Sequence, residues 1–471
     1  LAMRAVNLQQ LADTIGGQLQ GTVRNGLWVD SISSDTRLIK KGDVFIALQG
    51  ANFDANRFID QAQEKGAAAA IVSADISNDL PHIKVNDTLQ ALTVLARAER
   101  DKTTIPVVAI TGSNGKTSVK EMLASIIAQH KVVLATDGNL NNHIGVPLTL
   151  LKLNEKHQVA IIEMGASHKG EIQHLCAIAQ PTTSILNNVG EAHLEGFGDL
   201  QGVASAKAEI ITGLSASGTV VLNKEEPWFD QWLGLAGDRR VISFGWSSEA
   251  DVWAEKHSLE SGLLDGQFKT RFVMHYQQQS VTVELNLLGE HNILNALAAA
   301  SAALSLGVSL DDIATGLAKQ SAVKGRMQAL KGLVAELVIN DCYNANPKSF
   351  EAAMACLSTL KQETWLVLGD FAELGKESQQ IHCQLGVSIA NSAVRRVYAV
   401  GEMMRSTVEQ FNQLADSEGR QARHFPNKQA LAEALQNDLT ADVVVLVKGS
   451  RSQGLDSVVD KIIIKEAIAC C

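Results

Sequence analysis

Three observations predict an α/β protein divided into three domains. The chain has 471 residues, which is more than a single hydrophobic core usually serves. Apolar runs of strand length alternate with segments of helical period along the whole chain. Polar stretches interrupt this alternation before Pro106 and around Gly325. We therefore expect domains at residues 3–102, 103–325 and 326–471.

The first domain is expected to be a small α/β unit. Residues 44–48 and 67–72 are apolar runs typical of buried strands, and residues 58–66 have helical spacing. The polar loop before the first of these strands contains Ser34, Asp35, Thr36 and Arg37. Two interpretations stay open for this loop. It binds a small polar ligand beside the strand ends, or its two charged residues form an ion pair at the surface.

The second domain begins with a strand, a glycine-containing loop and a helix. Residues 105–110 are apolar, and apolar side chains recur at helical spacing over residues 119–127. The loop and helix start contain Gly112, Ser113, Asn114, Gly115, Lys116, Thr117 and Ser118. Such a loop holds phosphate with backbone N–H groups, while its lysine neutralises the outer phosphates and its threonine reaches Mg2+. Ile110 replaces the first glycine of the full pattern, so an ordinary strand-to-helix turn is the alternative.

Later loops of this domain carry residues that suit a site beside bound phosphate. The loop at residues 136–147 is rich in hydrogen-bonding groups and contains Asn139, Asn141 and Asn142. Glu163 ends the strand predicted at residues 159–162, where a Mg2+ ligand would lie. A capping or surface glutamate is the alternative for that position.

Three further features, each taken alone, are not evidence of a functional site. His193 lies between glycines, where a histidine is more often structural than a ligand. Lys207 lies in an apparent helix at residues 203–211, where a solvated lysine is the default. Residues 223–226 resemble a guanine-reading Asn-Lys-x-Asp motif, but the last residue is Glu226, so we assign no guanine binding to them.

The third domain is expected to be a Rossmann-like, doubly wound unit. Before it, still within the second domain, residues 250–285 alternate polar and apolar side chains, which indicates a β-hairpin insertion. A long helix follows at residues 293–306. Beyond Arg326, strands and helices alternate again. Ligands of such sheets bind at the carboxyl ends of the strands. We expect one cleft lined by the strand-end loops at residues 341–347, 369–375 and 448–451.

Composition narrows the class of partner. The net charge of 41 − 51 = −10 argues against binding nucleic acid or an anionic membrane. No apolar run reaches the roughly 18–20 residues of a membrane-spanning helix, and no signal peptide is visible. The 6 cysteines show no metal-binding spacing, so we expect reduced thiols in a cytoplasmic protein.

Together these loops resemble the Mur ligase family, whose members are ATP-dependent amino-acid ligases of peptidoglycan precursor synthesis. The resemblance spans all three domains in family order and is carried by residues 111–117, Glu163, His193, Lys207, Gly-Glu-His-Asn at 289–292, Arg326 and Asp341. The loops at residues 343–347, 368–375 and 448–451 are similar to those of members that join D-alanyl-D-alanine to UDP-N-acetylmuramoyl-tripeptide. The Asp-Asn-Pro-Arg motif of the member that adds the third residue is not found.

The resemblance implies roles for individual residues. Two Mg2+ ions would be held by Thr117, Glu163, His193 and a carbamylated Lys207. Besides the phosphate loop, ATP would contact Asn292, Arg326 and Asp341. The uridine-diphosphate end would lie on the first domain, with residues 34–37 and the asparagine-rich loop binding the precursor. The dipeptide would be gripped by Tyr343, Asn344, Asn346, Lys448 and Arg451. We expect a monomer.

The same resemblance implies a reaction through an acyl phosphate. A carboxylate resists attack by an amine, so ATP first phosphorylates it, and the dipeptide amine then displaces phosphate. Lys116, Lys207 and His193 are the expected catalytic residues. The alternatives are a sister ligase that adds another amino acid, a folylpolyglutamate-type ligase, and a non-catalytic sensor of nucleotide or cell-wall precursor.

Overall fold

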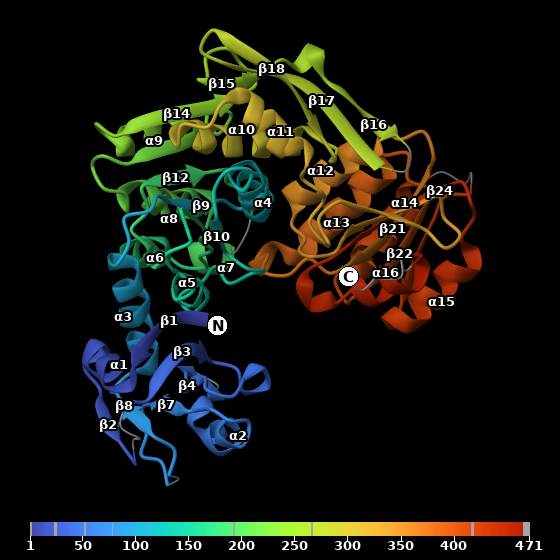
Figure 1. Ribbon diagram of the computed structural model, residues 1–471. Helices are drawn as coiled ribbons and strands as arrows, with labels where there is room; N and C mark the ends of the chain where they lie inside the picture. The colour runs from blue at the N-terminus through green and yellow to red at the C-terminus, as the bar shows by residue number, and fades with distance from the viewer. Residues whose placement is uncertain are drawn as a thin grey trace.

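The computed structural model describes residues 2–22, 26–50, 53–77, 79–191, 194–264, 267–415 and 419–464. Figure 1 shows the N-terminal part in blue at the foot of the molecule, the central part in green and yellow above it, and the C-terminal part in orange and red beside the central part. Each part is built on its own sheet with helices against it. The predicted α/β class is confirmed, while the residue limits of the domains stay a prediction.

The N-terminal sheet has the order β1-β3-β4-β7-β8-β2, with β3, β4, β7 and β8 parallel and the outer strands antiparallel to their neighbours. Its strands are β1 (Ala2–Asn7), β2 (Gln18–Gln20), β3 (Trp28–Ser33), β4 (Val44–Ile46), β7 (Ala69–Val72) and β8 (His82–Lys84). Helices α1 (Leu8–Ile15) and α2 (Ile59–Glu64) accompany it, with a small hairpin of β5 (Gln49–Gly50) and β6 (Phe53–Asp54).

Helix α3 (Thr88–Asp101) joins the first sheet to the central one. It packs on α1 below and on α5 (Gly145–Leu150) and α6 (Glu171–Ala179) above. The buried Arg100 ties the junction, because its Nε donates to the Ala179 carbonyl at 2.9 Å and its Nη1 to the Thr103 carbonyl at 2.7 Å. The helix that ends the predicted first domain is therefore anchored on the second.

The central sheet has the order β10-β11-β9-β12-β13-β14-β15-β17-β16, with β18 also paired to β17. The strands from β10 to β15 are parallel, and β16, β17 and β18 form an antiparallel extension that continues the sheet. The predicted insertion thus lies on the sheet edge. The strands are β9 (Val107–Thr111), β10 (Val133–Ala135), β11 (Val159–Glu163), β12 (Thr183–Leu186), β13 (Thr219–Asn223), β14 (Arg240–Gly245), β15 (Val252–Ala254), β16 (Glu260–Leu264), β17 (Gln267–Tyr276) and β18 (Gln279–Leu285).

Helices cover both faces of this sheet, which explains its continuous apolar strands. One face packs on α4 (Lys116–Ile127), α10 (Glu290–Ser305) and α11 (Leu310–Ala318). The other packs on α3, α5, α6, α8 (Leu200–Thr212) and α9 (Phe229–Ala236). A short helix, α7 (Leu194–Phe197), precedes α8. The sheet therefore holds the carboxyl ends of its parallel strands in one row, where the loops from β9, β11 and β12 meet.

The C-terminal sheet has the order β19-β20-β24-β21-β22-β23 and is parallel apart from β19. Its strands are β19 (Gln328–Lys331), β20 (Leu337–Asp341), β21 (Glu363–Gly369), β22 (Arg396–Val400), β23 (Gln421–Phe425) and β24 (Val443–Lys448). Helices α12 (Pro347–Leu357), α13 (Ser378–Ala390) and α14 (Met404–Leu414) cover one face, and α15 (Lys428–Asp438) and α16 (Asp456–Ile462) the other. The expected doubly wound arrangement is confirmed.

The central extension also reaches into the third core. Phe268, on β17, is 2% exposed and belongs to the apolar cluster that contains Phe350 of α12 and Leu366 of β21. Figure 1 shows β17 running from the top of the central part toward α12. Two parts of the chain thus share one hydrophobic cluster beside the cleft between them.

Candidate active site

The glycine-containing loop connects β9 to α4 as expected. Gly115 has a φ of 79°, a left-handed conformation that favours glycine. A Cβ atom at this position would lie 2.3 Å from the Asn295 Oδ1 atom, so a side chain has no room either. Residues 112–115 therefore bring backbone N–H groups to the start of α4, which is the arrangement that binds phosphate.

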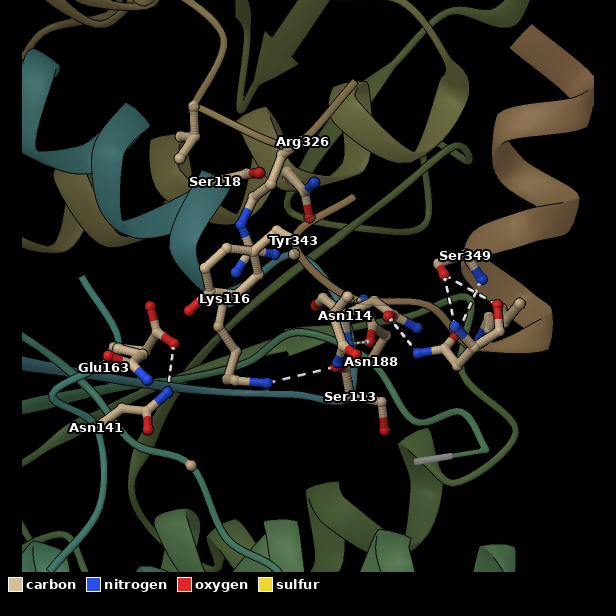
Figure 2. A pocket seen from close by; sticks show the side chains of 18 of the residues that line it. Ser113, Asn114, Lys116, Ser118, Asn141, Glu163, Asn188, Arg326, Tyr343 and Ser349 are labelled. Carbon is tan, nitrogen blue, oxygen red and sulfur yellow. Dashed lines mark hydrogen bonds between the residues drawn. The ribbon is translucent and has the colours of Figure 1, made fainter. Parts of the chain in front are cut away.

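Lys116 is folded back over this loop. Its Nζ donates to the Gly112 carbonyl at 2.7 Å and to the Ser113 carbonyl at 3.3 Å. Figure 2 shows the side chain pointing across the pocket toward Ser113. Desolvation by burial lowers the pKa of Lys116, and the positive charge of Arg326 lowers it further, while Glu163 opposes this shift. The ammonium is thus held where an incoming anion would replace carbonyl oxygens as its partner.

An oxygen-rich pair lies beside the lysine. The Thr117 hydroxyl donates to Glu163 Oε2 at 2.8 Å, and Asn141 Nδ2 donates to Glu163 Oε1 at 2.8 Å. Both Thr117 and Glu163 are buried. Hard divalent cations prefer oxygen donors of this kind. The structure therefore brings together the loop threonine, the strand-end glutamate and one of the three predicted asparagines.

Lys207 differs from its default interpretation. It lies on α8 but is only 2% exposed, so the solvated-lysine reading is wrong. Desolvation lowers its pKa well below the ordinary value, and the nearby charge of Lys116 lowers it further. Burial thus favours the neutral amine, which is the nucleophilic form of lysine.

Asparagine side chains surround the tip of the loop. Asn114 N donates to Asn188 Oδ1 at 2.8 Å, and its carbonyl accepts from both Asn187 Nδ2 and Asn188 Nδ2 at 3.0 Å. Asn346 Nδ2, from the C-terminal part, donates to Asn114 Oδ1 at 2.8 Å. Asn187 Nδ2 also donates to Asn295 Oδ1 at 2.8 Å. Asn187, Asn188 and Asn295 were not among the predicted site residues, although paired asparagines directly after a buried strand were a visible signal.

The C-terminal part contributes a buried ion pair. Lys448 Nζ lies 2.5 Å from Asp341 Oδ2, and Asp341 Oδ1 accepts from Met327 N at 3.0 Å. Next to this pair, burial lowers the pKa of His291 to about 4, so its imidazole is neutral. Lys448 was expected to hold the dipeptide; it lines the cavity and pairs with Asp341, and its contact with the dipeptide stays a prediction.

The predicted dipeptide and ATP residues lie around Tyr343. The Arg326 guanidinium lies 4.2 Å from the centre of the Tyr343 ring, and the Arg451 guanidinium lies 5.8 Å from it. Figure 2 shows Arg326 and Tyr343 next to each other. Arg451 also pairs with Asp456 at 2.6 Å. Asn292, expected to contact ATP, donates to the Leu288 carbonyl of its own helix start at 2.8 Å.

These groups face one cavity of about 900 Å3 between the central and C-terminal parts. The predicted residues that line it are Ser113, Asn114, Gly115, Lys116, Ser118, Asn139, Asn141, Asn142, Glu163, Lys207, Asn292, Arg326, Asp341, Tyr343, Asn344, Asn346 and Lys448. Gly112, Thr117 and Arg451 are not among the lining residues, but each contacts one that is. His193 lies outside the described residues.

The polar loop of the N-terminal part is not in this cavity. Ser34, Asp35, Thr36 and Arg37 line none of it. Arg37 Nη2 pairs with Asp35 Oδ2 at 2.7 Å, with the arginine largely exposed. This hydrogen-bonded pair lowers the pKa of Asp35. The surface ion pair, which was one of the two interpretations of this loop, is therefore present. Binding of the precursor by the loop stays a prediction.

Family models match nearly the whole chain. Residues 29–131 match the model described as Mur ligase family, catalytic domain, residues 110–303 match the Mur ligase middle domain, and residues 325–451 match the Mur ligase glutamate ligase domain. A curated relative from Escherichia coli K12, named UDP-N-acetylmuramoyl-tripeptide--D-alanyl-D-alanine ligase, is 40% identical over 461 residues, 97% of this chain and 98% of the relative. The chain belongs to the Mur ligase family.

Other Mur ligases extend this finding. A Bacillus subtilis relative of the same name is 32% identical over 97% of this chain and 98% of its own. A crystal structure of MurF from Acinetobacter baumannii has a TM-score of 0.88 and 33% identity, covering 98% of this chain and 99% of that one. A MurF ligase from Thermotoga maritima in complex with ADP has a TM-score of 0.78 and 28% identity, covering 93% of this chain and 98% of that one.

The fold itself is shared more widely. A folylpolyglutamate synthase from Mycobacterium tuberculosis is 16% identical at a TM-score of 0.61, which shows a shared fold alone. Within the described residues, no helix combines the length and apolar character needed to cross a membrane. For this Mur ligase, the cavity brings together the glycine-containing loop, Glu163 with its Thr117 partner, and the buried Lys207.

Proposed function

We propose that this Mur ligase joins D-alanyl-D-alanine to the terminal carboxyl group of UDP-N-acetylmuramoyl-tripeptide, with ATP converted to ADP and phosphate. The observation that carries the proposal is the Thr117–Glu163 pair at the phosphate loop, which opens on a cavity shared with the C-terminal part. The substrates are proposed from the names of relatives that align over nearly the whole chain. An ATP-dependent reaction on a nucleotide-linked precursor places it in the cytoplasm.

Activation of the acceptor carboxylate requires two anions to approach each other. Lys116 exchanges its loop carbonyl partners for phosphate oxygens and stabilises the charge that develops on them. The donors Thr117 Oγ1 and Glu163 Oε2 fit Mg2+, because both are oxygens, both are buried and they lie 2.8 Å apart. Bound Mg2+ would neutralise phosphate charge at this point. Asn141 orients the Glu163 carboxylate through Oε1.

After reaction with CO2, Lys207 would supply the anion that holds the second Mg2+ ion. Burial lowers the pKa of Lys207 and favours the neutral amine, whose nitrogen can form a C–N bond with CO2 and lose one proton, which yields a carbamate. A carbamate would place a negative charge next to the buried Lys116 ammonium, which favours the modified form. His193 is proposed as its partner on the second ion.

The amine-donating dipeptide is proposed to bind on the C-terminal side of the cavity. Tyr343, Asn344 and Asn346 line that side, and Arg451 lies beside the Tyr343 ring. The Arg451 guanidinium can pair with the dipeptide carboxylate by leaving Asp456. Lys448 acts differently in this proposal, as a positioning residue that holds Asp341 for ATP. We propose that the protein is a monomer.

The test is a phosphate-release assay with ATP, Mg2+, the tripeptide precursor and D-alanyl-D-alanine, in which each component is omitted in turn. The proposal expects release only when all four are present, with amide product found by mass spectrometry. Release without dipeptide, or tight nucleotide binding without turnover, would support a nucleotide sensor instead. Product with another amine alone would assign a sister ligase.

A Lys116→Ala variant checks the phosphate-loop assignment in the same assay. We expect turnover to fall by about 100-fold or more, since loss of one preorganised cationic donor removes that order of rate. Circular dichroism is expected to be unchanged, because the substitution removes a buried charge and deletes no packed ring. Full activity in this variant would remove the loop from the mechanism.

A further inference from the structure

Helix α12 of the C-terminal part begins directly against the central part. Asn346 caps the helix by accepting from Ser349 N at 2.8 Å. Lys348, in its first turn, donates from Nζ to the Val189 carbonyl at 2.9 Å and lies 3.4 Å from Glu226 Oε1. The Lys348 stem also passes close to Gly190, where a Cβ atom would lie 3.1 Å from the Lys348 Cδ atom. One lysine therefore contacts the loop after β12 at several points.

Glu226 belongs to the segment that resembled a guanine reader in the sequence. It is 7% exposed, and its Oε2 accepts from Val189 N at 3.1 Å. Asn223 Nδ2, three residues earlier, donates to the Asn187 carbonyl at 2.9 Å. Burial raises the pKa of Glu226, and Lys348 opposes this shift. Asn223 and Glu226 thus bind the backbone of residues 187–189. The buried Glu226 carboxylate is stabilised by a cation from another part of the chain, Lys348.

The same short loop holds the phosphate loop on its opposite side. Ser113 Oγ contacts both backbone atoms of Gly190, with distances of 3.0 Å to its carbonyl oxygen and 2.9 Å to its nitrogen. Ser113 N donates to the Asn188 carbonyl at 3.0 Å. Residues 187–190 therefore connect the Lys348–Glu226 pair to the loop that receives phosphate, because the pair bonds Val189 and Ser113 bonds the adjacent residues Asn188 and Gly190.

We propose that Lys348 and Glu226 form an interdomain latch, a pair of positioning residues that sets the shape of the phosphate loop through residues 187–190 when the C-terminal part docks. The inference rests on the proposed function, since ATP is taken as the ligand of that loop. Lys348 also lines the active-site cavity, whereas Glu226 does not, so an effect of Glu226→Gln on the KM for ATP reports the latch and not a direct contact with the ligand. The effect of the latch falls on nucleotide affinity and on the order of residues 187–190.

The kinetic test uses Lys348→Met, Glu226→Gln, the double variant and Lys348→Arg. We expect each single variant to raise the KM for ATP about fivefold, and the double variant to raise it no more than either single variant, because residues in contact are coupled. Arginine keeps the positive charge and a hydrogen-bond donor, so the Lys348→Arg variant is expected to have the wild-type KM for ATP. A matched pair, Lys269 and Glu284, lies 3.1 Å apart on the central extension outside the cavity. Its Lys269→Met and Glu284→Gln variants should keep the wild-type KM.

A structural test runs on the same proteins without nucleotide. Hydrogen exchange at residues 187–190 and 113–115 is expected to be faster in Lys348→Met and unchanged in Lys269→Met. Thermal midpoints of Glu226→Gln should match wild type, because the glutamine oxygen still accepts from Val189 N and a buried charge is removed. A destabilised fold would instead speed exchange throughout the chain.

Two outcomes overturn the latch. One is unchanged exchange at residues 187–190 in Lys348→Met, and the other is a double variant whose KM effect is the product of the single effects. Absence of phosphate release by the wild-type protein would defeat the proposed function alone. The exchange experiment would then still decide whether Lys348 orders the loop, so the two failures are distinguishable.

Discussion

Arg326 Nη2 donates a hydrogen bond of 2.9 Å to Thr117 Oγ1, although 209 positions separate the two residues in the chain. Thr117 in turn donates to Glu163, so the start of the C-terminal part is bonded to the proposed cation-binding pair. The same guanidinium lies 4.2 Å from the Tyr343 ring. One side chain therefore links the proposed ATP site to the C-terminal part.

Replacing Arg326 by lysine tests this link. Lysine keeps the charge but has neither a planar fork nor a flat face for Tyr343. A hydrogen bond from a charged donor is worth about 1.5–3 kcal/mol, so kcat/KM for ATP is expected to fall by about 10–100-fold. Steady-state phosphate release measures the effect, with Arg271→Lys on the exposed β17 surface as the control. Equal kcat/KM in both variants would show that Thr117 needs no partner from the third part.

Lys207→Ala is expected to be nearly inactive and to regain part of its activity when formate or acetate is added. The small acid would replace the proposed carbamate as an anion in the cavity. A Lys207→Met variant offers the same space as lysine without a nitrogen and should resist rescue. Wild-type activity in Lys207→Ala would return this residue to a packing role.

The pH dependence of CO2 activation follows from the lowered pKa of Lys207. Burial and the Lys116 charge favour the neutral amine, so the reactive form persists to lower pH than for an ordinary lysine. As pH falls through that lowered pKa, the amine becomes protonated and the carbamate is lost. Activity in CO2-depleted buffer should therefore decline toward acid and recover with bicarbonate. A bicarbonate response that is the same at all pH values would contradict this account.

Replacing Arg451 is predicted to weaken dipeptide binding, whereas replacing Lys448 is predicted to lower the stability of the fold. Arg451→Ala removes a largely exposed cation and should raise the KM for D-alanyl-D-alanine while leaving the thermal midpoint near wild type. Lys448→Met leaves the Asp341 carboxylate buried without its partner, which costs about 3–5 kcal/mol of unfolding free energy. Calorimetry and dipeptide titration distinguish the two variants. Unchanged dipeptide KM in Arg451→Ala would place the grip elsewhere.

Thiol reactivity should follow burial. Desolvation raises the pKa of Cys176, Cys342 and Cys356 to about 12, so these thiols carry almost no thiolate at pH 8. Cys383 is only partly buried, on α13. Brief iodoacetamide treatment followed by peptide mass spectrometry is expected to modify Cys383 well before the other three. Labelling of Cys176 at a similar rate would indicate that the central core opens readily.

Sequence patterns predicted local structure well. The apolar run before Gly112 is β9, and the spacing after Lys116 is α4, because both patterns record how one element packs against a sheet. Strand ends also located Glu163 and Asp341 at the cavity, since parallel strands present their carboxyl ends together. These features depend on neighbours in the chain.

Pairings between distant residues could not be read from the chain. The burial of Lys207, the Lys448–Asp341 pair and the Arg326–Thr117 bond depend on how separate sheets meet. The partners of residues 223–226 were also hidden in the sequence. This segment resembles a guanine-reading motif, but Asn223 and Glu226 bind the backbone of residues 187–189. Spacing identifies the type of side chain available, whereas the partner is chosen by tertiary packing.

Phe268 has a consequence for any attempt to study the parts singly. By connectivity it belongs to the central extension, yet its ring completes the cluster around Phe350. A fragment beginning near residue 325 would lack that ring and expose an apolar hollow to water, which favours self-association. The C-terminal part is thus better studied with the β17 strand supplied in trans than as an isolated fragment.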